Sequence, residues 1–182
     1  MPLALDKRSW HPSPLPGQIV LVTTVGPDGT VDVAPKSWVS MVSLAGPVLG
    51  FGCSTLHRTY ANIEATGEFV VNVAPSQVAA EAWSMLLSHG PERLDRSGLT
   101  LAPASRVSPP VVLDCVAFLE CRLIQTTAFA DEVFIFGSVV AGAIAEECLG
   151  GDMAARYRAL DPCFYLEEGV YAGLSSPMTA PA

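Results

Sequence analysis

The sequence has 182 residues, of which 50% are hydrophobic and 15% are charged, and its formal net charge at pH 7 is −8. The acidic charge argues against binding to nucleic acid or to an anionic membrane surface, since both select basic proteins. The apolar segments are too short and too often interrupted to cross a bilayer. The length predicts one domain, and the apolar excess predicts a further buried surface, most simply a subunit interface.

The five cysteines are odd in number and form no CxxC pair, so neither a disulfide framework nor a zinc ribbon is expected. The N-terminus carries its charges after its few apolar residues, which is the reverse of a secretory signal. Both features predict a cytoplasmic protein with reduced thiols. The three histidines do not cluster with acidic residues at ligand spacing, so no metal site is expected.

Residues 1–17 are rich in proline and are predicted to form an extended N-terminal arm, whereas residues 18–175 are predicted to form the single domain. We expect no internal repeat. The arm is expected to lie across another surface.

The domain begins with a hairpin signature. A β-branched stretch over residues 18–25 is followed by the turn sequence Gly26-Pro27-Asp28-Gly29 and by a return strand over residues 30–33. A proline within residues 34–37 cannot donate to a strand ladder, which predicts a bulge or a sheet edge there before pairing resumes over residues 38–43.

Later elements follow from periodicity. Strands are predicted over residues 47–52, 69–73, 111–124, 133–145 and 164–173, and helices over residues 60–66, between Ser76 and His89, and over residues 152–160. Thr59 is the expected N-cap of the first helix and Gly67 its C-terminal stop. Residues 92–110 are expected to be irregular, a loop longer than packing requires. Together, these strands and helices predict a mainly β fold, a small antiparallel barrel with short inserted helices.

The two long strands differ in pattern. The strand over residues 111–124 is predicted to direct Leu113 and Cys121 into the core and Glu120 to the opposite face. The strand over residues 133–145 is apolar on both faces, which predicts the core on one side and a partner subunit on the other.

Three segments in this order carry a family resemblance: residues 23–43 (TTVGPDGTVDVAPKSWVSMVS), 50–59 (GFGCSTLHRT) and, most specifically, 62–73 (NIEATGEFVVNV). Together they resemble the flavin reductase-like family over most of residues 15–170. The resemblance implies an antiparallel split β-barrel that works as a homodimer and binds FMN, or FAD, near the subunit interface. It also implies NADH or NADPH as a transient reductant, and a small-molecule acceptor or a partner monooxygenase for the electrons.

The residues themselves predict a phosphate pocket for such a cofactor. Ser54, Thr55 and Thr59 provide hydroxyl groups, and His57 and Arg58 provide positive charge. The start of the adjoining helix provides free N–H groups, which favour a bound anion.

The resemblance implies that the flavin ring edge meets mostly backbone groups after the first hairpin, at Ala34, Lys36, Ser37 and Trp38, with Cys53 also in contact. Lys36 would stabilise an anionic reduced flavin. Because the cofactor carries the chemistry, no catalytic acid or base is expected.

Plainer interpretations remain open for single residues. Thr59 and Gly67 suit helix caps without any ligand, Arg58 suits a surface ion pair, and Trp38 suits the core or an interface. Two other functions also remain open: a non-catalytic flavin-binding or flavin-delivery module partnering a monooxygenase, and a barrel that binds another planar ligand such as haem. The choice between NADH and NADPH is not decided.

Overall fold

The structure, a computed structural model, describes residues 15–87 and 92–174. Its main feature is a seven-stranded sheet in which each neighbouring pair is antiparallel, in the order β3-β2-β6-β9-β10-β5-β4. The strands are β2 (Val20–Val25), β3 (Val31–Lys36), β4 (Val39–Ser43), β5 (Val48–Ser54), β6 (Glu68–Val73), β9 (Ala117–Phe129) and β10 (Glu132–Ile144).

Two smaller sheets and several short helices complete the described fold. The strands are β1 (Gly17–Gln18), β11 (Phe164–Glu167) and β12 (Val170–Ala172) in one sheet, and β7 (Leu101–Ala102) and β8 (Val111–Val112) in the other. The helices are α1 (Arg58–Thr66), α2 (Ala79–Leu87), α3 (Glu92–Ser97) and α4 (Met153–Leu160), with single 3-10 turns η1 (Ser76–Val78) and η2 (Glu146–Cys148). The predicted arm over residues 1–17 lies outside the described residues as far as residue 14.

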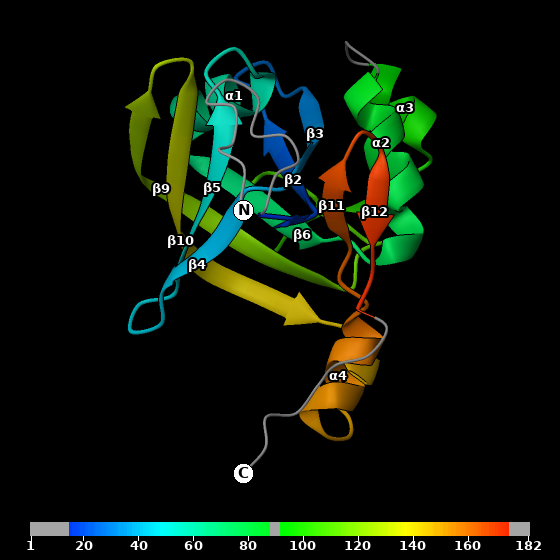
Figure 1. The fold of residues 1–182 in the computed structure, drawn as a ribbon. Coiled ribbons are helices and arrows are strands. Elements are labelled where there is room, and N and C mark those ends of the chain that lie inside the picture. The colour runs from blue at the N-terminus through cyan, green and yellow to red at the C-terminus, as the bar shows by residue number, and fades with distance from the viewer. Residues whose placement is uncertain (1–14, 88–91, 175–182) are drawn as a thin grey trace, which may run out of the picture.

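The large sheet curls around an apolar core (Figure 1). The buried core side chains are Val20, Val22, Leu49, Phe51, Cys53, Ile63, Phe69, Val71, Cys121, Val133 and Ile135. Phe51 and Phe69 meet edge to face with their ring centroids 5.5 Å apart, a favourable aromatic geometry. Helix α1 lies against β2, β3 and β5. This curled antiparallel sheet with short helices confirms the predicted mainly β, split-barrel fold class.

The predicted first hairpin forms β2 and β3. The Gly26 N–H donates to the Thr30 carbonyl (2.9 Å), and Gly29 turns the chain with a φ of 80° that favours glycine. Strand β3 continues through Pro35, opposite Leu21, to Lys36 without a register shift, so the alternative of a bulge was wrong. The alternative of a sheet edge was right, because β3 is the terminal strand and its free side needs no donor there.

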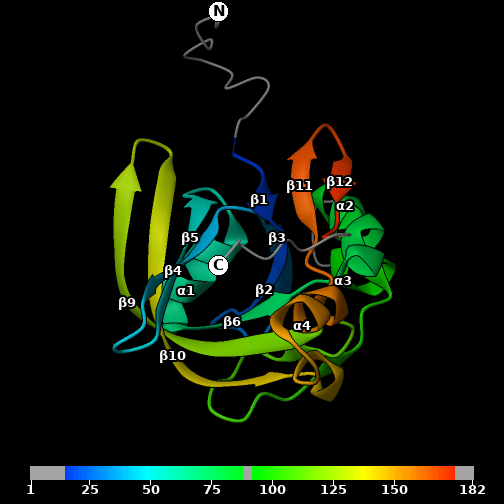
Figure 2. The ribbon, with the colours of Figure 1, turned by 60° about the horizontal axis from the view of Figure 1, so that its bottom comes forward.

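A second core lies on the other side of β2 and β3, under α2, α3 and the β11–β12 hairpin (Figure 2). Leu21 and Val33 face it from the sheet, and Val78, Ala82 and Met85 face it from the helical segment. The helix predicted between Ser76 and His89 is therefore confirmed up to residue 87, and its predicted end lies outside the described residues. Within the described residues no helix is long and apolar enough to cross a membrane.

The strand predicted over residues 111–124 is two strands, β8 and β9, separated by a turn. Leu113 lies in that turn with 57% of its surface exposed, so its predicted core position was wrong. Glu120 is buried, because its carboxylate accepts hydrogen bonds from the backbone N–H groups of Ser105 (2.9 Å) and Arg106 (2.5 Å). Backbone donors from a distant loop thus make burial of a carboxylate tolerable.

Two other segments also differ from their prediction. The predicted irregular stretch over residues 92–110 contains α3 and β7. The single closing strand predicted over residues 164–173 is a hairpin of β11 and β12, turned at Glu168 and Gly169, which both have positive φ.

The predicted helix over residues 152–160 is confirmed as α4, with the Asp152 side chain accepting the Ala155 N–H (2.8 Å).

Candidate functional site

The loop between β5 and α1 determines where the helix begins. The His57 carbonyl accepts the N–H groups of Tyr60 (3.1 Å) and Ala61 (3.3 Å), so α1 starts at Arg58 with His57 as its N-cap. The predicted N-cap at Thr59 was therefore wrong, because the turn closes two residues earlier. The His57 side chain makes no capping hydrogen bond within the described structure, which leaves first-turn N–H groups to meet another acceptor. Gly67 ends the helix as predicted, with a φ of 72°.

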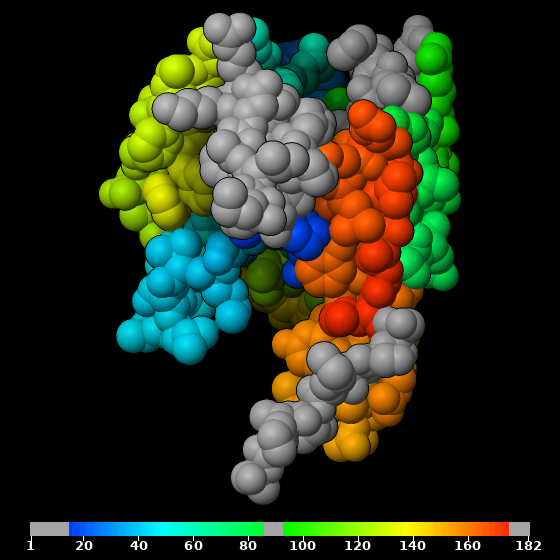
Figure 3. Space-filling model, viewed as in Figure 1, coloured from blue at the N-terminus to red at the C-terminus, as the bar shows by residue number. Residues whose placement is uncertain are grey.

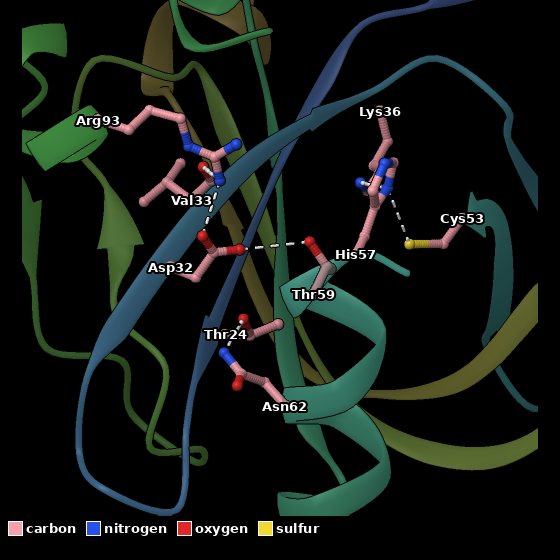
Figure 4. Close-up of polar contacts among 9 residues, drawn as sticks. All are labelled: Thr24, Asp32, Val33, Lys36, Cys53, His57, Thr59, Asn62 and Arg93. Carbon is pink, nitrogen blue, oxygen red and sulfur yellow. Dashed lines mark hydrogen bonds and ion pairs between the residues drawn. The ribbon is translucent and has the colours of Figure 1, made fainter. Parts of the chain in front are cut away.

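Thr59 has a different partner from the one expected. Its hydroxyl donates to Oδ2 of Asp32 on β3 (3.3 Å), and Oδ1 of Asp32 accepts from Nη2 of Arg93 on α3 (2.7 Å). Nη2 of Arg93 also donates to the Val33 carbonyl (2.7 Å) (Figure 4). These contacts join α1, β3 and α3. Thr59 is buried and lines neither of the pockets described next.

A small pocket of about 270 Å³ lies where the end of β3, the end of β5 and the β5–α1 loop meet. It is lined by Pro35, Lys36, Ser37, Trp38, Gly52, Cys53, Ser54, His57 and Glu132. Six of these residues were predicted cofactor contacts, so the structure brings together most of the predicted ring-edge set. Ala34 is the exception, because it is buried opposite Val22 on β3 and does not line the pocket.

Trp38 forms one wall of this small pocket and is 59% exposed. Its carbonyl accepts the Gly52 N–H (2.8 Å), and a Cβ atom at Gly52 would lie 2.6 Å from ring atom Cε3 of Trp38. The absence of a side chain at Gly52 therefore lets the indole lie directly over β5. An exposed aromatic face beside polar groups suits contact with a flat ligand.

The polar side of the small pocket is a cluster of Lys36, His57 and Cys53 (Figure 4). His57 Nδ1 lies 3.3 Å from Lys36 Nζ and 3.7 Å from Cys53 Sγ. Burial lowers the pKa of Lys36, and burial together with the nearby Lys36 charge lowers the pKa of His57. Burial raises the pKa of the Cys53 thiol, and Lys36 opposes that rise. Near neutral pH the cluster combines an ammonium donor, a neutral imidazole and a thiol.

A larger pocket of about 550 Å³ lies on the other side of His57. Its lining residues are Pro27, Asp28, Thr30, Thr55, Leu56, His57, Arg58, Ala61 and Asn62. The predicted phosphate contacts Thr55 and Arg58 therefore sit here, and His57 belongs to both pockets. The Thr55 hydroxyl is already used as a donor to the Asp131 carbonyl (3.1 Å), so toward a ligand it offers its oxygen rather than its proton.

Sequence reasoning missed several residues of this region. Asp32 and Arg93 are 61 positions apart, and no local pattern pairs them. Glu132 reaches the small pocket because the long strand β10 pairs it with Ser54, a register that periodicity alone does not determine. Asp28 had only the signal of a tight turn, to which it was assigned, and the structure brings that turn to the pocket that Arg58 lines. Across residues 15–87 and 92–174, no group of three or more His, Cys, Asp or Glu side chains is arranged to hold a metal ion.

Comparisons with known proteins identify relatives in sequence and structures of similar fold. The chain is 28% identical over 164 residues to HsaB of Mycobacterium tuberculosis, the reductase subunit of a flavin-dependent monooxygenase, covering 90% of this chain and 79% of that protein. Two solved structures share its fold. One is a candidate flavin reductase with a split barrel domain from Shewanella frigidimarina (16% identity, TM-score 0.86, 100% of both chains). The other is an FMN-binding protein from Thermus thermophilus with bound p-hydroxybenzaldehyde (19% identity, TM-score 0.81, 100% of this chain and 99% of that one).

The family model described as flavin reductase like domain matches residues 13–169. This match spans the curled sheet, both pockets and the β11 strand. The chain therefore belongs to the flavin reductase-like family.

Proposed function

We propose that this chain is an FMN-dependent oxidoreductase that takes reducing equivalents from NADH or NADPH and passes them to another acceptor. The observation that carries the proposal is the small pocket, in which the Trp38 face lies beside the Lys36 ammonium. His57 joins this pocket to the larger one, which Arg58 lines. Family membership and the likeness to a monooxygenase reductase subunit support it.

The donor set fits the phosphate of FMN. Arg58 and His57 lie at the start of α1, whose first-turn N–H groups and helix dipole favour an anion. The Ser54 hydroxyl already donates to the Asp131 carbonyl (3.4 Å), so the donors here are these two side chains and the first-turn N–H groups. A dianionic phosphate bound here would gain charge-assisted hydrogen bonds, which are roughly twice as strong as neutral ones.

The small pocket fits the flat ring system. Trp38 would contact the ring as a wall, and the backbone of Ser37 lies next to it on the same segment. Lys36 would hold a positive charge near the ring edge and so favour the reduced, anionic form. When bound, the flavin supplies the hydride and electron transfer, and the protein binds, orients and electrostatically tunes it.

We also propose a homodimer as the working unit. Apolar side chains are exposed along β4 and the turn after it, including Met41 (77%) and Leu44 (83%), and Figure 3 shows this hairpin projecting from the body of the molecule. Further exposed apolar side chains are spread along β9 and β10, including Ile124, Phe129, Val140 and Ile144. Exposed apolar patches of this kind are typical of subunit interfaces. Light scattering at micromolar concentration would return twice the chain mass, and a monomer mass would contradict the proposal.

The proposed activity is tested by adding FMN and then NADH or NADPH to the purified chain and following nucleotide oxidation. FMN retention with accelerated oxidation supports the proposal. FMN retention without turnover would instead favour a flavin-delivery module that serves a partner monooxygenase. A chain that retains no flavin would contradict both functions.

A further inference from the structure

The small pocket carries a charge that the proposed flavin contacts do not use. Glu132 begins β10 and lines this pocket, but it is not among the residues proposed to hold FMN. Glu132 is exposed, whereas Lys36 on another wall is partly buried, so the carboxylate lies at the opening and the ammonium lies deeper. Within the described part of the chain neither residue has an ion-pair partner. The pocket therefore has an anionic opening and a cationic interior.

The charge of Glu132 acts on the interior of this pocket. Burial and the nearby Lys36 lower the pKa of His57, and Glu132 opposes both. Burial raises the pKa of the Cys53 thiol, Lys36 opposes that rise, and Glu132 adds to it. A ligand that enters past the carboxylate meets the same charge. A cation is attracted there and an anion is repelled.

The outer face of β10 beside Glu132 is aromatic. Val133 and Ile135 point into the core, so strand alternation places Phe134 and Phe136 on the face that carries Glu132. The two phenylalanine ring centroids lie 5.8 Å apart, and both side chains are half-buried. The carboxylate at the opening of the pocket therefore has an aromatic surface next to it.

Two glycines of β5 join this aromatic surface to the pocket. Gly52, which lines the pocket, pairs with Phe134 on one side, and on the other its N–H donates to the Trp38 carbonyl (2.8 Å). Gly50 pairs with Phe136, and a Cβ atom at Gly50 would lie 3.0 Å from ring atom Cδ1 of Phe136. Side chains are thus missing from β5 where aromatic side chains of the neighbouring strands lie. If Trp38 contacts the flavin ring, Phe134 remains for a second flat ligand.

We propose that Glu132 and Phe134 select the electron acceptor, a flat aromatic compound without negative charge, such as a quinone or an aromatic cation. This inference rests on the proposed function and names the acceptor class that it left open. Phe134 would contact the face of the acceptor, and Glu132 would attract a positive charge on it and repel a negative one. Overall, NADH or NADPH and one solvent proton would convert a quinone into a quinol. Aromatic carboxylates and sulfonates would be poor acceptors.

The first test measures binding, by isothermal titration calorimetry on the FMN-loaded chain. The probes are 1-naphthylmethylamine and 1-naphthoate, which share a ring system, carry opposite charges at pH 7 and take no electrons from flavin. The wild type prefers the cation, and Glu132→Gln narrows that preference about tenfold because the carboxylate charge is removed. Glu132→Asp keeps the charge and most of the preference. Glu147→Gln, an equal change of net charge at an exposed residue of η2 outside both pockets, leaves the preference unaltered.

Phe134→Leu tests the aromatic contact separately from the charge. It weakens binding of both probes about fivefold and leaves the preference unchanged, since leucine removes the flat face but no charge. Probe affinities that do not respond to this change would remove Phe134 from the site.

Turnover gives an independent measurement of acceptor choice. With NADH as donor, Glu132→Gln lowers the ratio of kcat/KM for 1,4-naphthoquinone to kcat/KM for its 2-sulfonate about tenfold, because the repulsion of the sulfonate is removed. Both acceptors meet the same reduced flavin, so a change in the flavin alone would alter the two rates together.

An unchanged preference in Glu132→Gln, or equal changes for the two probes or the two acceptors, would overturn the role of Glu132. A chain that binds FMN but then binds neither probe would show that the acceptor site is wrong while the proposed flavin site stands. If FMN itself does not bind, the proposed function and this inference are both wrong.

Discussion

Two ionisable residues on β3, Asp32 and Lys36, lie four positions apart and have very different surroundings (Figure 4). Asp32 is matched in charge and in hydrogen bonds. It accepts from the Arg93 guanidinium (2.7 Å) and from the Thr59 hydroxyl (3.3 Å), and both side chains of the ion pair are mostly buried. The charges of Asp32 and Arg93 therefore neutralise each other within the protein, and the contacts join β3, α3 and α1.

Lys36 is not matched in this way. Its ammonium lies 3.3 Å from a ring nitrogen of His57, and the neighbouring Cys53 thiol is largely protonated near neutral pH. Among the residues that the structure describes, no carboxylate lies within ion-pair distance of Lys36. A matched charge stabilises the fold, whereas a partly buried cation without a counter-charge is available to an anionic ligand.

The largest expected effect comes from breaking the matched pair. Arg93→Leu leaves Asp32 without its counter-charge and should lower the free energy of unfolding by about 2–4 kcal/mol. Arg122→Leu is the control, since Arg122 is 60% exposed and lies 3.6 Å from Glu68, so its loss should cost less than about 1 kcal/mol. Urea denaturation measures both values. Equal losses for the two variants would contradict the structural role of the Asp32–Arg93 pair.

The next effect concerns binding rather than stability. Arg58→Ala should weaken FMN binding by about 1–3 kcal/mol, the range for a charge-assisted hydrogen bond to phosphate. Flavin fluorescence titration measures this affinity. Arg158→Ala, an exposed change on α4 away from both pockets, serves as the control and should leave it unaltered. An unchanged affinity for Arg58→Ala would remove Arg58 from the phosphate site.

A smaller effect is expected on the redox potential of the bound cofactor. Lys36→Gln removes the unmatched positive charge and should lower the two-electron midpoint potential of bound FMN by about 30 mV, which corresponds to about 1.4 kcal/mol. Lys36→Arg keeps the charge and should restore most of the difference. Spectroelectrochemical titration measures the midpoint potential of bound FMN in each variant. A potential that does not respond to the charge at position 36 would mean that Lys36 only fills space.

The smallest effect is a pH dependence of stability from His57. Its pKa is lowered in the folded protein, so below its ordinary value of 6.5 the unfolded chain binds more protons than the folded chain. Stability should therefore fall as the pH drops below about 6.5. His57→Gln should remove that component, which is visible as a flatter curve of urea midpoint between pH 5 and 7. Identical curves for wild type and variant would show that His57 does not titrate differently on folding.

The sequence predicted the segments of the candidate site better than their individual contacts. Lys36, Ser37 and Trp38 meet Cys53 and His57 because two locally recognisable features, a hairpin and a strand–turn–helix, are placed side by side by the curled sheet. Their types and order are visible in the sequence.

Contacts that depend on register or on distant loops were not predictable in this way. Ala34 was assigned to the site through its backbone, but it is buried within β3 between two other buried residues, Val33 and Pro35, and it does not line the small pocket. Thr59 has the right type for a phosphate ligand, yet its hydroxyl is used by Asp32 on another element. Glu120 was predicted on the face opposite Cys121, and its burial there was not predicted, because its backbone donors come from a loop about 15 residues earlier, which alternation does not detect.

The most direct test of the account is the visible spectrum of the purified chain, recorded before and after addition of FMN and then after anaerobic NADH. The account predicts flavin bands that stay with the protein through gel filtration and that bleach when NADH is added. A chain that retains no flavin after incubation with excess FMN would contradict the assignment of the two pockets as a flavin site.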